Sequence, residues 1–347
     1  MIQVKKEGVV LYKTALGFES EGVLNPAVIM VDDKIHLFYR AVSKGNYSSI
    51  GYCLLSAPML VEERYDSPIL IAEGSCESHG IEDPRITEID GTFYLSYTAY
   101  DGTNALGCLA ISQDLKQFQK LGKIVPKIHY KTFARLASSG VPLNEKYVRF
   151  NVSQKTANID GKTKYIWDKN VVFFPRRING KLYFLHRIKP DIQIASIDSL
   201  EDLGKAFWQN YLLHFNNHIL MHSIYPHEIS YIGGGCPPIE TSAGWLLIYH
   251  GVYDTASGYV YTACAALLDL DQPEKEIARL PYPLFEPELN CEKVGYVNNV
   301  CFPTGAVVIA ETLYIYYGAA DEQIACASVN LPNLISELLL NPTPHVK

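Results

Sequence analysis

Apolar and polar residues alternate in paired segments that recur five times along the chain, each pair following a proline. Alternation with a period of two, in segments rich in Tyr, Phe, Ile and Val, predicts β-strands. In each unit a first strand at the proline is followed by a second, aromatic-rich strand. The five units lie at residues 26–40, 84–97, 175–187, 238–250 and 303–317.

Turn signals separate the two strands of each unit, as in Asp90-Gly91 and Asn179-Gly180. Both dipeptides favour tight hairpins because their residues tolerate positive φ. We expect a third strand after each unit and a fourth, outer strand that completes each sheet. The predicted third strands are rich in Gly, Ala and Cys and lie at residues 50–54, 106–111, 192–196, 260–265 and 323–327.

The spacing of the units predicts the fold. Units that recur every roughly 60 to 90 residues indicate a repeat architecture, and an all-β repeat of this size is typical of a propeller. We therefore predict an all-β, five-bladed β-propeller with a short C-terminal helix over residues 333–339. No linker interrupts the pattern, so residues 1–347 are expected to form a single domain. Radial repetition would gather polar residues from distant units at one axial funnel.

Two stretches interrupt the rhythm of the repeats. Residues 120–170 form a long insertion with a polar, hairpin-like tip around residues 160–162, and residues 199–230 form another that is rich in His and Asn. Long connections inside a compact fold are often functional. We expect both insertions to border the funnel and to shape access for a substrate.

Composition narrows the class of protein. Hydrophobic residues make up 48% of the 347 positions, which suits a large core, and the net charge of −7 argues against nucleic acid or an anionic membrane as a partner. The first residues lack the apolar run of a signal peptide, and no stretch is long enough to cross a bilayer. The eight cysteines show no paired spacing and are expected to be reduced. These features predict a cytoplasmic protein, and they leave open whether it forms a homo-oligomer.

Polar residues precede the proline in the first two units. Asn25 and Asp83 occupy this place, and Asp83 follows Glu82 and precedes Pro84-Arg85. A residue before proline is usually extended, which would fix the direction of its side chain. The carboxylate pair beside a cation fits a salt-bridged strand entrance equally well, but the matched position of Asn25 favours a functional site at the axis.

A second set of polar residues follows the aromatic strands. Arg40, Arg187 and His250 occupy matched places, where Thr98 and Tyr317 are their counterparts in the other units. Arg offers a bidentate fork and His a tunable donor, so the set suits an anion, although ion pairs to loop carboxylates would also explain it. Lys169, Asn170 and Asp321 could reach the same mouth.

Two further motifs carry less weight. His214, His218 and His222 are spaced by four, as metal ligands on one helix face would be, but Asn216-Asn217 disfavour a helix and no acidic residue completes the set. We therefore expect no metal. Gly233-Gly234-Gly235 lacks the remaining residues of a phosphate loop and precedes Cys236-Pro237 rather than a helix, so a tight turn is the better interpretation.

Several motifs together resemble glycoside hydrolase family 130, which contains β-mannoside phosphorylases and some β-mannosidases on a five-bladed propeller. The resemblance spans about residues 20–330, with motifs in order in every unit. These motifs are Gly80-Ile81-Glu82-Asp83-Pro84-Arg85, Tyr97-Thr98-Ala99-Tyr100-Asp101-Gly102, residues 174–181, residues 237–239 with 244–251, and Tyr316-Tyr317-Gly318-Ala319-Ala320-Asp321.

The resemblance implies roles for individual residues. Asp83 would be the general acid and would protonate the glycosidic oxygen through a hydroxyl of the mannose, while Asn25, Arg85, Tyr97, Tyr100 and Asp321 would bind the sugar. Arg40, Lys169, Asn170 and His250 would hold phosphate. The chain departs from the family at Tyr231, where phosphorylases tend to have lysine or arginine. Losing this cation weakens a phosphate site, and Glu228 nearby could then be the water-activating base of a hydrolase.

The leading hypothesis is therefore an inverting β-mannoside phosphorylase that acts on an oligosaccharide with inorganic phosphate as co-substrate and no other cofactor. The alternatives are an inverting β-mannosidase of the same family and a carbohydrate-binding propeller without turnover. An arabinanase or xylosidase is more remote, because such enzymes need further axial carboxylates beyond Asp83 and Asp321. The linkage, the acceptor sugar and the preferred chain length are left open.

Overall fold

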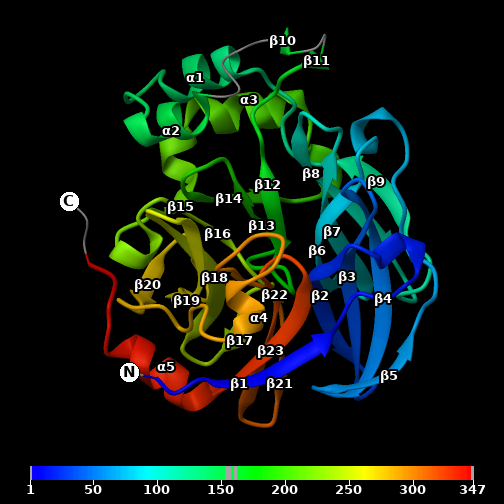
Figure 1. Ribbon diagram of the computed structural model, residues 1–347. Coiled ribbons are helices and arrows are strands. Elements are labelled where there is room, and N and C mark those ends of the chain that lie inside the picture. Colours follow the sequence, from blue (N-terminus) through cyan, green and yellow to red (C-terminus); the bar gives the residue numbers. More distant parts are fainter. Residues whose placement is uncertain (1, 153–157, 160–161, 345–347) are drawn as a thin grey trace.

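Five small antiparallel sheets surround one axis in the computed structural model, which describes residues 2–152, 158–159 and 162–344 (Figure 1). This confirms the predicted five-bladed β-propeller. The first blade contains β2 (Gly22–Val31), β3 (Lys34–Ser43), β4 (Tyr47–Ala57) and β5 (Leu60–Arg64). The second contains β6 (Ile81–Ile89), β7 (Thr92–Tyr100), β8 (Ala105–Ser112) and β9 (Gln119–Lys123).

The third blade contains β12 (Lys169–Phe173), β13 (Leu182–Arg187), β14 (Ile192–Ile197) and β15 (Ile219–Met221). The fourth contains β16 (Tyr231–Gly234), β17 (Ile239–Thr241), β18 (Gly244–Thr255), β19 (Gly258–Leu268) and β20 (Glu276–Arg279), with β16 and β17 both paired to β18. In each blade the first strand lies nearest the axis, and the remaining strands follow outward.

The fifth blade closes the ring with strands from both ends of the chain. It contains β21 (Cys301–Ile309), β22 (Thr312–Ala319) and β23 (Gln323–Asn330), and its outermost strand is β1 (Lys5–Leu11), which pairs antiparallel with β23. The predicted C-terminal helix is present as α5 (Leu331–Leu339), which begins after Asn330 and buries Leu334 and Leu338. The ring is therefore completed only when the two ends of the sequence meet.

The two insertions fold into a helical layer on one side of the ring (Figure 1). The first contains α1 (Tyr130–Ala137), α2 (Glu145–Phe150) and a hairpin of β10 (Asn158–Ile159) with β11 (Lys162–Thr163). The predicted tip at residues 160–162 falls largely outside the described residues. The second contains α3 (Lys205–Leu213), and rings of Phe133, Tyr147 and Phe215 pack between the two insertions.

Pro238 directly precedes β17, as the sequence pattern suggested, but three other repeat prolines lie inside their strands: Pro26, Pro84 and Pro303. Pro26 and Pro84 each lie next to a bulge in β2 and β6. In β2, Leu24 pairs with Arg40 but Ala27 pairs with Phe38. In β6, Glu82 pairs with Thr98 but Arg85 pairs with Ser96. Asn25 and Asp83 are not extended but left-handed, with φ of 50° and 51°. Asn and Asp tolerate this region better than other residues, and bulges re-aim a side chain. The predicted conformation before proline is therefore wrong at both positions.

The third unit also has its bulge at a different place. Between Lys169 and Val172 the pairing of β12 shifts, and Asn170 there has a φ of 52°. Asn170 is thus the counterpart of Asn25 and Asp83, whereas the proline alignment pointed to Phe174. The three left-handed residues come from three neighbouring blades.

A buried carboxylate binds the second strand of every blade, and we call this arrangement the blade clamp. In four blades a tyrosine hydroxyl donates to a glutamate, over 2.6 Å in Tyr39–Glu19, 2.8 Å in Tyr97–Glu77, 2.7 Å in Tyr249–Glu228 and 2.6 Å in Tyr317–Glu292. In the third blade His186 Nδ1 lies 2.8 Å from Asp168 Oδ1. Each carboxylate precedes the innermost strand of its blade.

The outermost strand supplies a cation to four of these clamps. Arg64, Lys120, Arg279 and Lys6 come from β5, β9, β20 and β1, and each forms an ion pair with the glutamate of its own blade. Burying a carboxylate is costly unless ion pairing and hydrogen bonds compensate for the lost water. The clamp therefore joins the entrance, the second strand and the outer edge of one blade.

The clamps correct the alignment of the fifth unit. Tyr317, not Tyr316, is the counterpart of Tyr39 and Tyr249, so Gly318 takes the place of Arg40 and His250 at the funnel. A Cβ atom on Gly318 would lie 2.2 Å from Asn25 Oδ1. Gly318 thus leaves the space that the side chain of Asn25 occupies.

Two remaining expectations concern cysteines and membranes. All eight cysteines are free, and Cys53, Cys108, Cys264 and Cys326 are buried on the third strands of their blades, as predicted. Among the described residues no helix is both long and apolar enough to span a bilayer.

We expect Lys6→Met to destabilise the protein by about 3–5 kcal/mol, because it leaves the fully buried Glu292 without its cation. Urea denaturation measures this loss. Lys5→Met is the matched control, since Lys5 is exposed and pairs only with Glu7 at the surface. Equal midpoints for the two variants would contradict the importance of the clamp.

Candidate active site

A cavity of about 250 Å³ lies where the inner strands of all five blades meet. Seven of the residues predicted for the site line it together, although they are far apart in sequence. They are Asn25, Arg40, Asp83, Lys169, Asn170, Tyr231 and Asp321. The convergence at the axis, which the propeller hypothesis required, is therefore observed.

Asp83 is the buried carboxylate on the second blade's side of this cavity. Asn25 Nδ2 donates to its Oδ1 over 2.7 Å, Arg40 lies 3.7 Å from Oδ1, and Lys169 Nζ lies 3.9 Å from Oδ2. Burial opposes ionisation, but Lys169, Arg40 and Arg85 outweigh it, so the pKa of Asp83 lies below its usual value. In the cavity without an added anion, Asp83 is therefore a carboxylate.

Glu82 competes with Asp83 for the same cations. Its carboxylate lies 3.0 Å from Arg40 and 3.4 Å from Lys169 Nζ, and Arg40 Nε also donates to Ser48 over 2.8 Å. Arg40 is therefore held in position by side chains of the first and second blades together.

The third and fourth blades face Asp83 with cations and amide groups. Arg187 NH1 donates to Nε2 of the fully buried His250 over 3.0 Å. Burial, then Arg187 and Arg85, lower the pKa of His250 well below its usual value, so the ring is neutral and carries its proton on Nδ1. Within the described structure Asn170 Nδ2, Arg187 Nε and His250 Nδ1 are buried without a hydrogen-bond partner.

Gly233 makes this arrangement possible. The segment that we interpreted as a tight turn is the inner strand β16, in which Gly233 pairs with His250. A Cβ atom on Gly233 would lie 2.5 Å from the His250 ring and 2.7 Å from Asn170 Nδ2. The interpretation as a turn is wrong, and the glycine provides room for two donors.

Asp321 lies across the cavity from these donors, after β22, with a φ of 52°. Burial raises its pKa to about 6, an effect that Arg40 opposes and Asp83 reinforces. The two carboxylates that line the cavity, Asp83 and Asp321, are thus shifted in opposite directions.

Three residues predicted to bind sugar have other positions. Tyr97 is buried in the clamp of the second blade, with its hydroxyl on Glu77. Arg85 is fully buried and donates to the backbone carbonyls of Asp83, Pro84 and Gly235, which supports the floor of the site. Tyr100 is half-buried and packs edge-on against Trp167 near the mouth, outside the cavity lining. For Tyr97 and Arg85 the geometry contradicts direct contact with a substrate.

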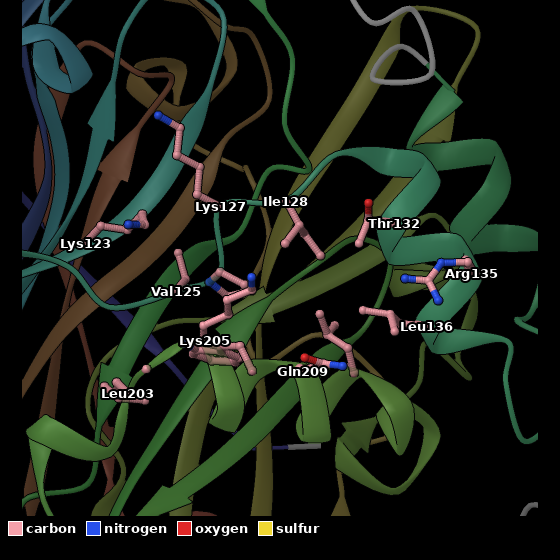
Figure 2. Close-up of a pocket in the computed structure, with 14 residues that line it drawn as sticks. Lys123, Val125, Lys127, Ile128, Thr132, Arg135, Leu136, Leu203, Lys205 and Gln209 are labelled. Carbon is pink, nitrogen blue, oxygen red and sulfur yellow. The ribbon is translucent and has the colours of Figure 1, made fainter.

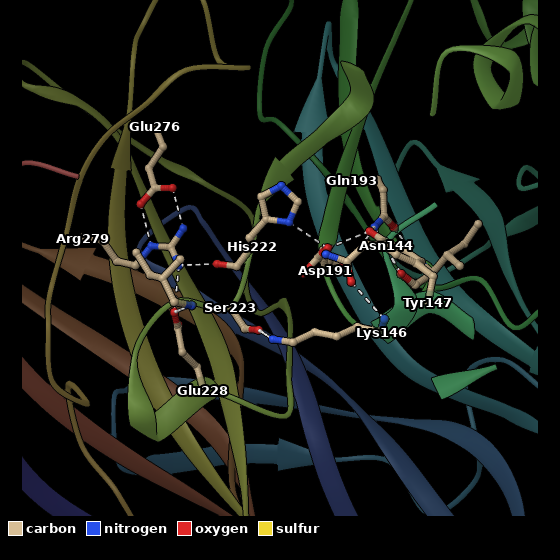
Figure 3. A network of polar contacts seen from close by, with 12 residues as sticks. Asn144, Lys146, Tyr147, Asp191, Gln193, His222, Ser223, Glu228, Glu276 and Arg279 are labelled. Carbon is tan, nitrogen blue, oxygen red and sulfur yellow. Dashed lines mark hydrogen bonds and ion pairs between the residues drawn. The ribbon is translucent and has the colours of Figure 1, made fainter. Parts of the chain in front are cut away.

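Glu228 is the carboxylate of the fourth blade clamp, not an accessible base. Figure 3 shows it held by Arg279, which lies 2.8 Å away and also binds Glu276. Its other oxygen accepts from Tyr249 over 2.7 Å, and it is fully buried. Although Glu228 is close to Tyr231 in sequence, it does not line the cavity, so the structure does not bring it together with the other predicted site residues.

The sequence analysis missed several residues of the cavity wall. Trp167, Lys189, Tyr261 and Phe302 line it, and Trp167 belongs to the first insertion. Trp167 directly precedes the clamp carboxylate Asp168, and Phe302 is the residue before the repeat proline of the fifth unit. These repeat positions were a usable signal, whereas nothing in the local sequence marks Lys189.

The remaining candidates do not form sites at the axis. A separate cavity of about 450 Å³ between α1 and α3 is lined by Lys123, Lys127, Arg135 and Lys205, and it holds none of the predicted site residues (Figure 2). His214, His218 and His222 do not share a helix: His214 ends α3, His218 stacks on Tyr211, and His222 binds Asp191. His227, Glu228 and Cys264 lie close enough to share a metal, but Arg279 already neutralises Glu228.

Comparison with known proteins shows to which family the chain is similar. The family model of glycoside hydrolase family 130, described as beta-1,4-mannooligosaccharide phosphorylase, matches residues 17–338. A 1,2-beta-oligomannan phosphorylase from Thermoanaerobacter sp. (strain X514) is 33% identical over 346 residues, 96% of this chain and 99% of the relative. A beta-1,2-mannobiose phosphorylase from the same strain is 35% identical over 328 residues, 90% of this chain and 91% of the relative.

A solved structure supports the fold. The beta-1,2-mannobiose phosphorylase from Listeria innocua, in complex with beta-1,2-mannobiose, has a TM-score of 0.74 and 22% identity, and the match covers 98% of this chain and all of that one. Together with the family model and the two relatives, the propeller fold defines a carbohydrate-active enzyme. The long family match then identifies it more closely: the chain belongs to glycoside hydrolase family 130.

We expect Glu228→Gln to lower stability by about 1–3 kcal/mol, because Arg279 loses one of its two buried carboxylate partners, while the folded variant keeps the kcat and KM of mannoside cleavage. Thermal unfolding and steady-state kinetics test this together. A loss of kcat by orders of magnitude in a fully folded variant would instead identify Glu228 as a base.

We expect Asp321→Asn to stabilise the protein at neutral pH. Because the folded-state pKa of about 6 exceeds the ordinary value of 3.8, the folded chain retains a proton that the unfolded chain has released. Stability contributed by Asp321 is therefore lost as the pH rises from 4 towards 6. In phosphate-free buffer, the advantage of the variant should grow by roughly 1–2 kcal/mol between pH 4.5 and 7. A difference that does not change with pH would contradict the raised pKa.

Proposed function

We propose that this protein is an inverting β-mannoside phosphorylase, which cleaves β-1,2-linked mannosyl oligosaccharides with inorganic phosphate and releases α-mannose 1-phosphate. The preference for the β-1,2 linkage rests on the names of the two relatives that align along nearly the whole chain. Trp167, Tyr261 and Phe302 form an aromatic wall of the cavity. Such rings can stack on the apolar face of a mannose ring.

The observation that carries the proposal is a cluster of buried donors without acceptors. Asn170 Nδ2 and Arg187 Nε belong to residues that line the cavity beside Lys169, and they have no partner among the described residues. His250 Nδ1 also lacks one there, although His250 is fully buried beside Arg187 and does not line the cavity. Buried donors are normally satisfied, and an unpaired one costs about 1–3 kcal/mol. Phosphate offers acceptor oxygens in every direction and carries the charge that the surrounding cations complement.

The cluster also distinguishes phosphorolysis from hydrolysis. An inverting hydrolase needs a second carboxylate to activate water on the face opposite the acid. Glu228 is held by Arg279 and Tyr249, outside the cavity, and the third and fourth blades supply cations and amides instead. Phosphate needs no such base because it is already a nucleophilic anion.

Asp83 acts as the general acid, and phosphate prepares it for this role. Without an anion, Lys169 and Arg40 keep the pKa of Asp83 low. A phosphate ion near Lys169 adds negative charge beside Asp83 and raises its pKa, because like charges disfavour ionisation. Asp83 therefore gains its proton when phosphate is bound, which protects the glycosidic bond while phosphate is absent.

In the reaction, a phosphate oxygen attacks the anomeric carbon as the glycosidic C–O bond breaks. Asp83 passes its proton through a mannose hydroxyl to the departing oxygen, in the relay that the family resemblance implies. Monohydrogen phosphate brings one proton and loses it on becoming the sugar phosphate ester, and this restores the proton of Asp83. Asn25 holds Asp83, and Asp321 accepts hydrogen bonds from sugar hydroxyls.

The other predictions from the sequence are kept as part of this proposal. Inorganic phosphate is the co-substrate and no other cofactor is required. The cytoplasmic location and the single domain stay predictions, as does the expectation that neither nucleic acid nor a membrane is a partner.

We expect cleavage of β-1,2-mannobiose to require phosphate and to produce α-mannose 1-phosphate, which anomer-resolved NMR detects. β-1,4-mannobiose serves as the linkage control. Equal release of mannose without phosphate would assign hydrolysis, and binding without any product under both conditions would assign a carbohydrate-binding propeller.

In the same assay, Asp83→Asn should lower kcat by about two to four orders of magnitude, because a positioned general acid contributes this much. Circular dichroism verifies that the variant is folded. A folded variant that keeps most of its activity would contradict the role of Asp83.

A further inference from the structure

We propose that Lys189 is a phosphate-binding residue and that Tyr231 positions it, so that the end of the third blade supplies a cation where the fourth blade's inner strand has none. This inference rests on the proposed phosphorolysis and assigns a residue that neither the motifs nor the resemblance singled out.

Lys189 and Tyr231 face one another across the boundary between two blades. Lys189 follows β13, Tyr231 opens β16, and both line the cavity. Lys189 Nζ lies 3.7 Å from the centroid of the Tyr231 ring. An ammonium group over an aromatic face is attracted by the ring's quadrupole, more strongly when both are partly desolvated.

The pair is fixed from several sides. The carbonyl of Pro190 accepts from the backbone N–H of Ile232 over 2.9 Å, which joins the segment of Lys189 to β16. Asn151 Nδ2, just after α2, donates to the carbonyl of Lys189 over 3.1 Å. The hydroxyl of Tyr231 contacts that of Tyr261, which also lines the cavity. The Tyr231 ring is therefore held in one position, against which the ammonium group of Lys189 packs.

Lys189 has no carboxylate to neutralise it among the described ion pairs, unlike the clamp cations. Its neighbours are instead cationic or neutral: Arg187, Lys169, Tyr231 and the neutral His250. Burial, then Arg187 and Lys169, lower the pKa of Lys189 well below its usual value. A lysine held among like charges at the wall of a cavity lacks an anion, and a phosphate beside Arg187 and Asn170 would supply it.

Tyr231 is the position at which the sequence departs from the phosphorylase pattern of lysine or arginine. The structure explains how a site can keep its charge despite this change. An ammonium group reaches the face of the Tyr231 ring from the neighbouring blade, so the cation is displaced rather than lost.

The test compares phosphate and mannoside parameters in the purified enzyme. We expect Lys189→Met to raise the KM for phosphate and the Kd for inorganic phosphate, measured by calorimetry without mannoside, by roughly 10-fold to 100-fold. The KM for β-1,2-mannobiose should change less than threefold. Lys189→Gln, which keeps a polar head, is the second variant and should behave like Lys189→Met. Lys205→Met, which removes a lysine from the separate cavity of Figure 2, is the matched control and should leave phosphate binding unchanged.

Three further variants separate the effect of charge from that of packing. Lys189→Met/Tyr231→Lys moves the cation to the fourth blade and should restore most of the lost phosphate affinity. Tyr231→Phe keeps the aromatic face and should weaken phosphate binding less than Tyr231→Ala, which removes it. These results together would support a positioning role for the ring.

The possible failures are distinguishable. If the wild-type enzyme needs phosphate but Lys189→Met and Lys189→Gln bind it within twofold of wild type, this inference is overturned and the proposed function stands. If both variants lose only thermal stability, the pair is structural and the inference is again overturned. If the wild type neither binds nor requires phosphate, the proposed function and this inference fail together.

Discussion

The blade clamps are the constraint on which the rest of the structure depends. A buried carboxylate at the entrance of a blade must be compensated, and here a side chain of the second strand and, in four blades, a cation of the outermost strand do so. Glu19 precedes Asn25 at the same spacing as Glu77 precedes Asp83. In the first two blades the clamp carboxylate and the left-handed bulge are therefore held at the same separation along the chain.

Within this framework, the two sides of the cavity carry different charges. The first, second and fifth blades bring Asn25, Arg40, Asp83 and Asp321, while the third and fourth bring Lys169, Asn170 and Arg187, with His250 beneath them. Among the described residues Asn170 Nδ2, Arg187 Nε and His250 Nδ1 lack partners, whereas Lys169, Arg40 and Arg85 together lower the pKa of Asp83. One anion placed between them would satisfy the donors and restore the proton of the acid. Binding of phosphate and protonation of the general acid Asp83 are therefore coupled through the same charges.

Much of this could be predicted from the sequence, for identifiable reasons. Alternation and turn signals repeat in every blade, so the fold and the convergence of Asn25, Asp83 and Asp321 followed from pattern and symmetry. Bulges leave no mark in local propensity, and for this reason the conformation of Asn25 and the alignment of Asn170 were wrong. Glu228 was misassigned because closeness to Tyr231 in sequence says nothing about which side of a strand a side chain faces. Lys189 acts across a blade boundary, which only the folded ring defines.

The most direct test of the account is a crystal structure of the enzyme with bound phosphate and without mannoside. The account predicts one phosphate ion within hydrogen-bond distance of Asn170, Arg187 and Lys189, on the side of the cavity that faces Asp83. A phosphate bound only at the outer surface, or an axis that stays free of phosphate at concentrations that saturate the enzyme, would contradict it.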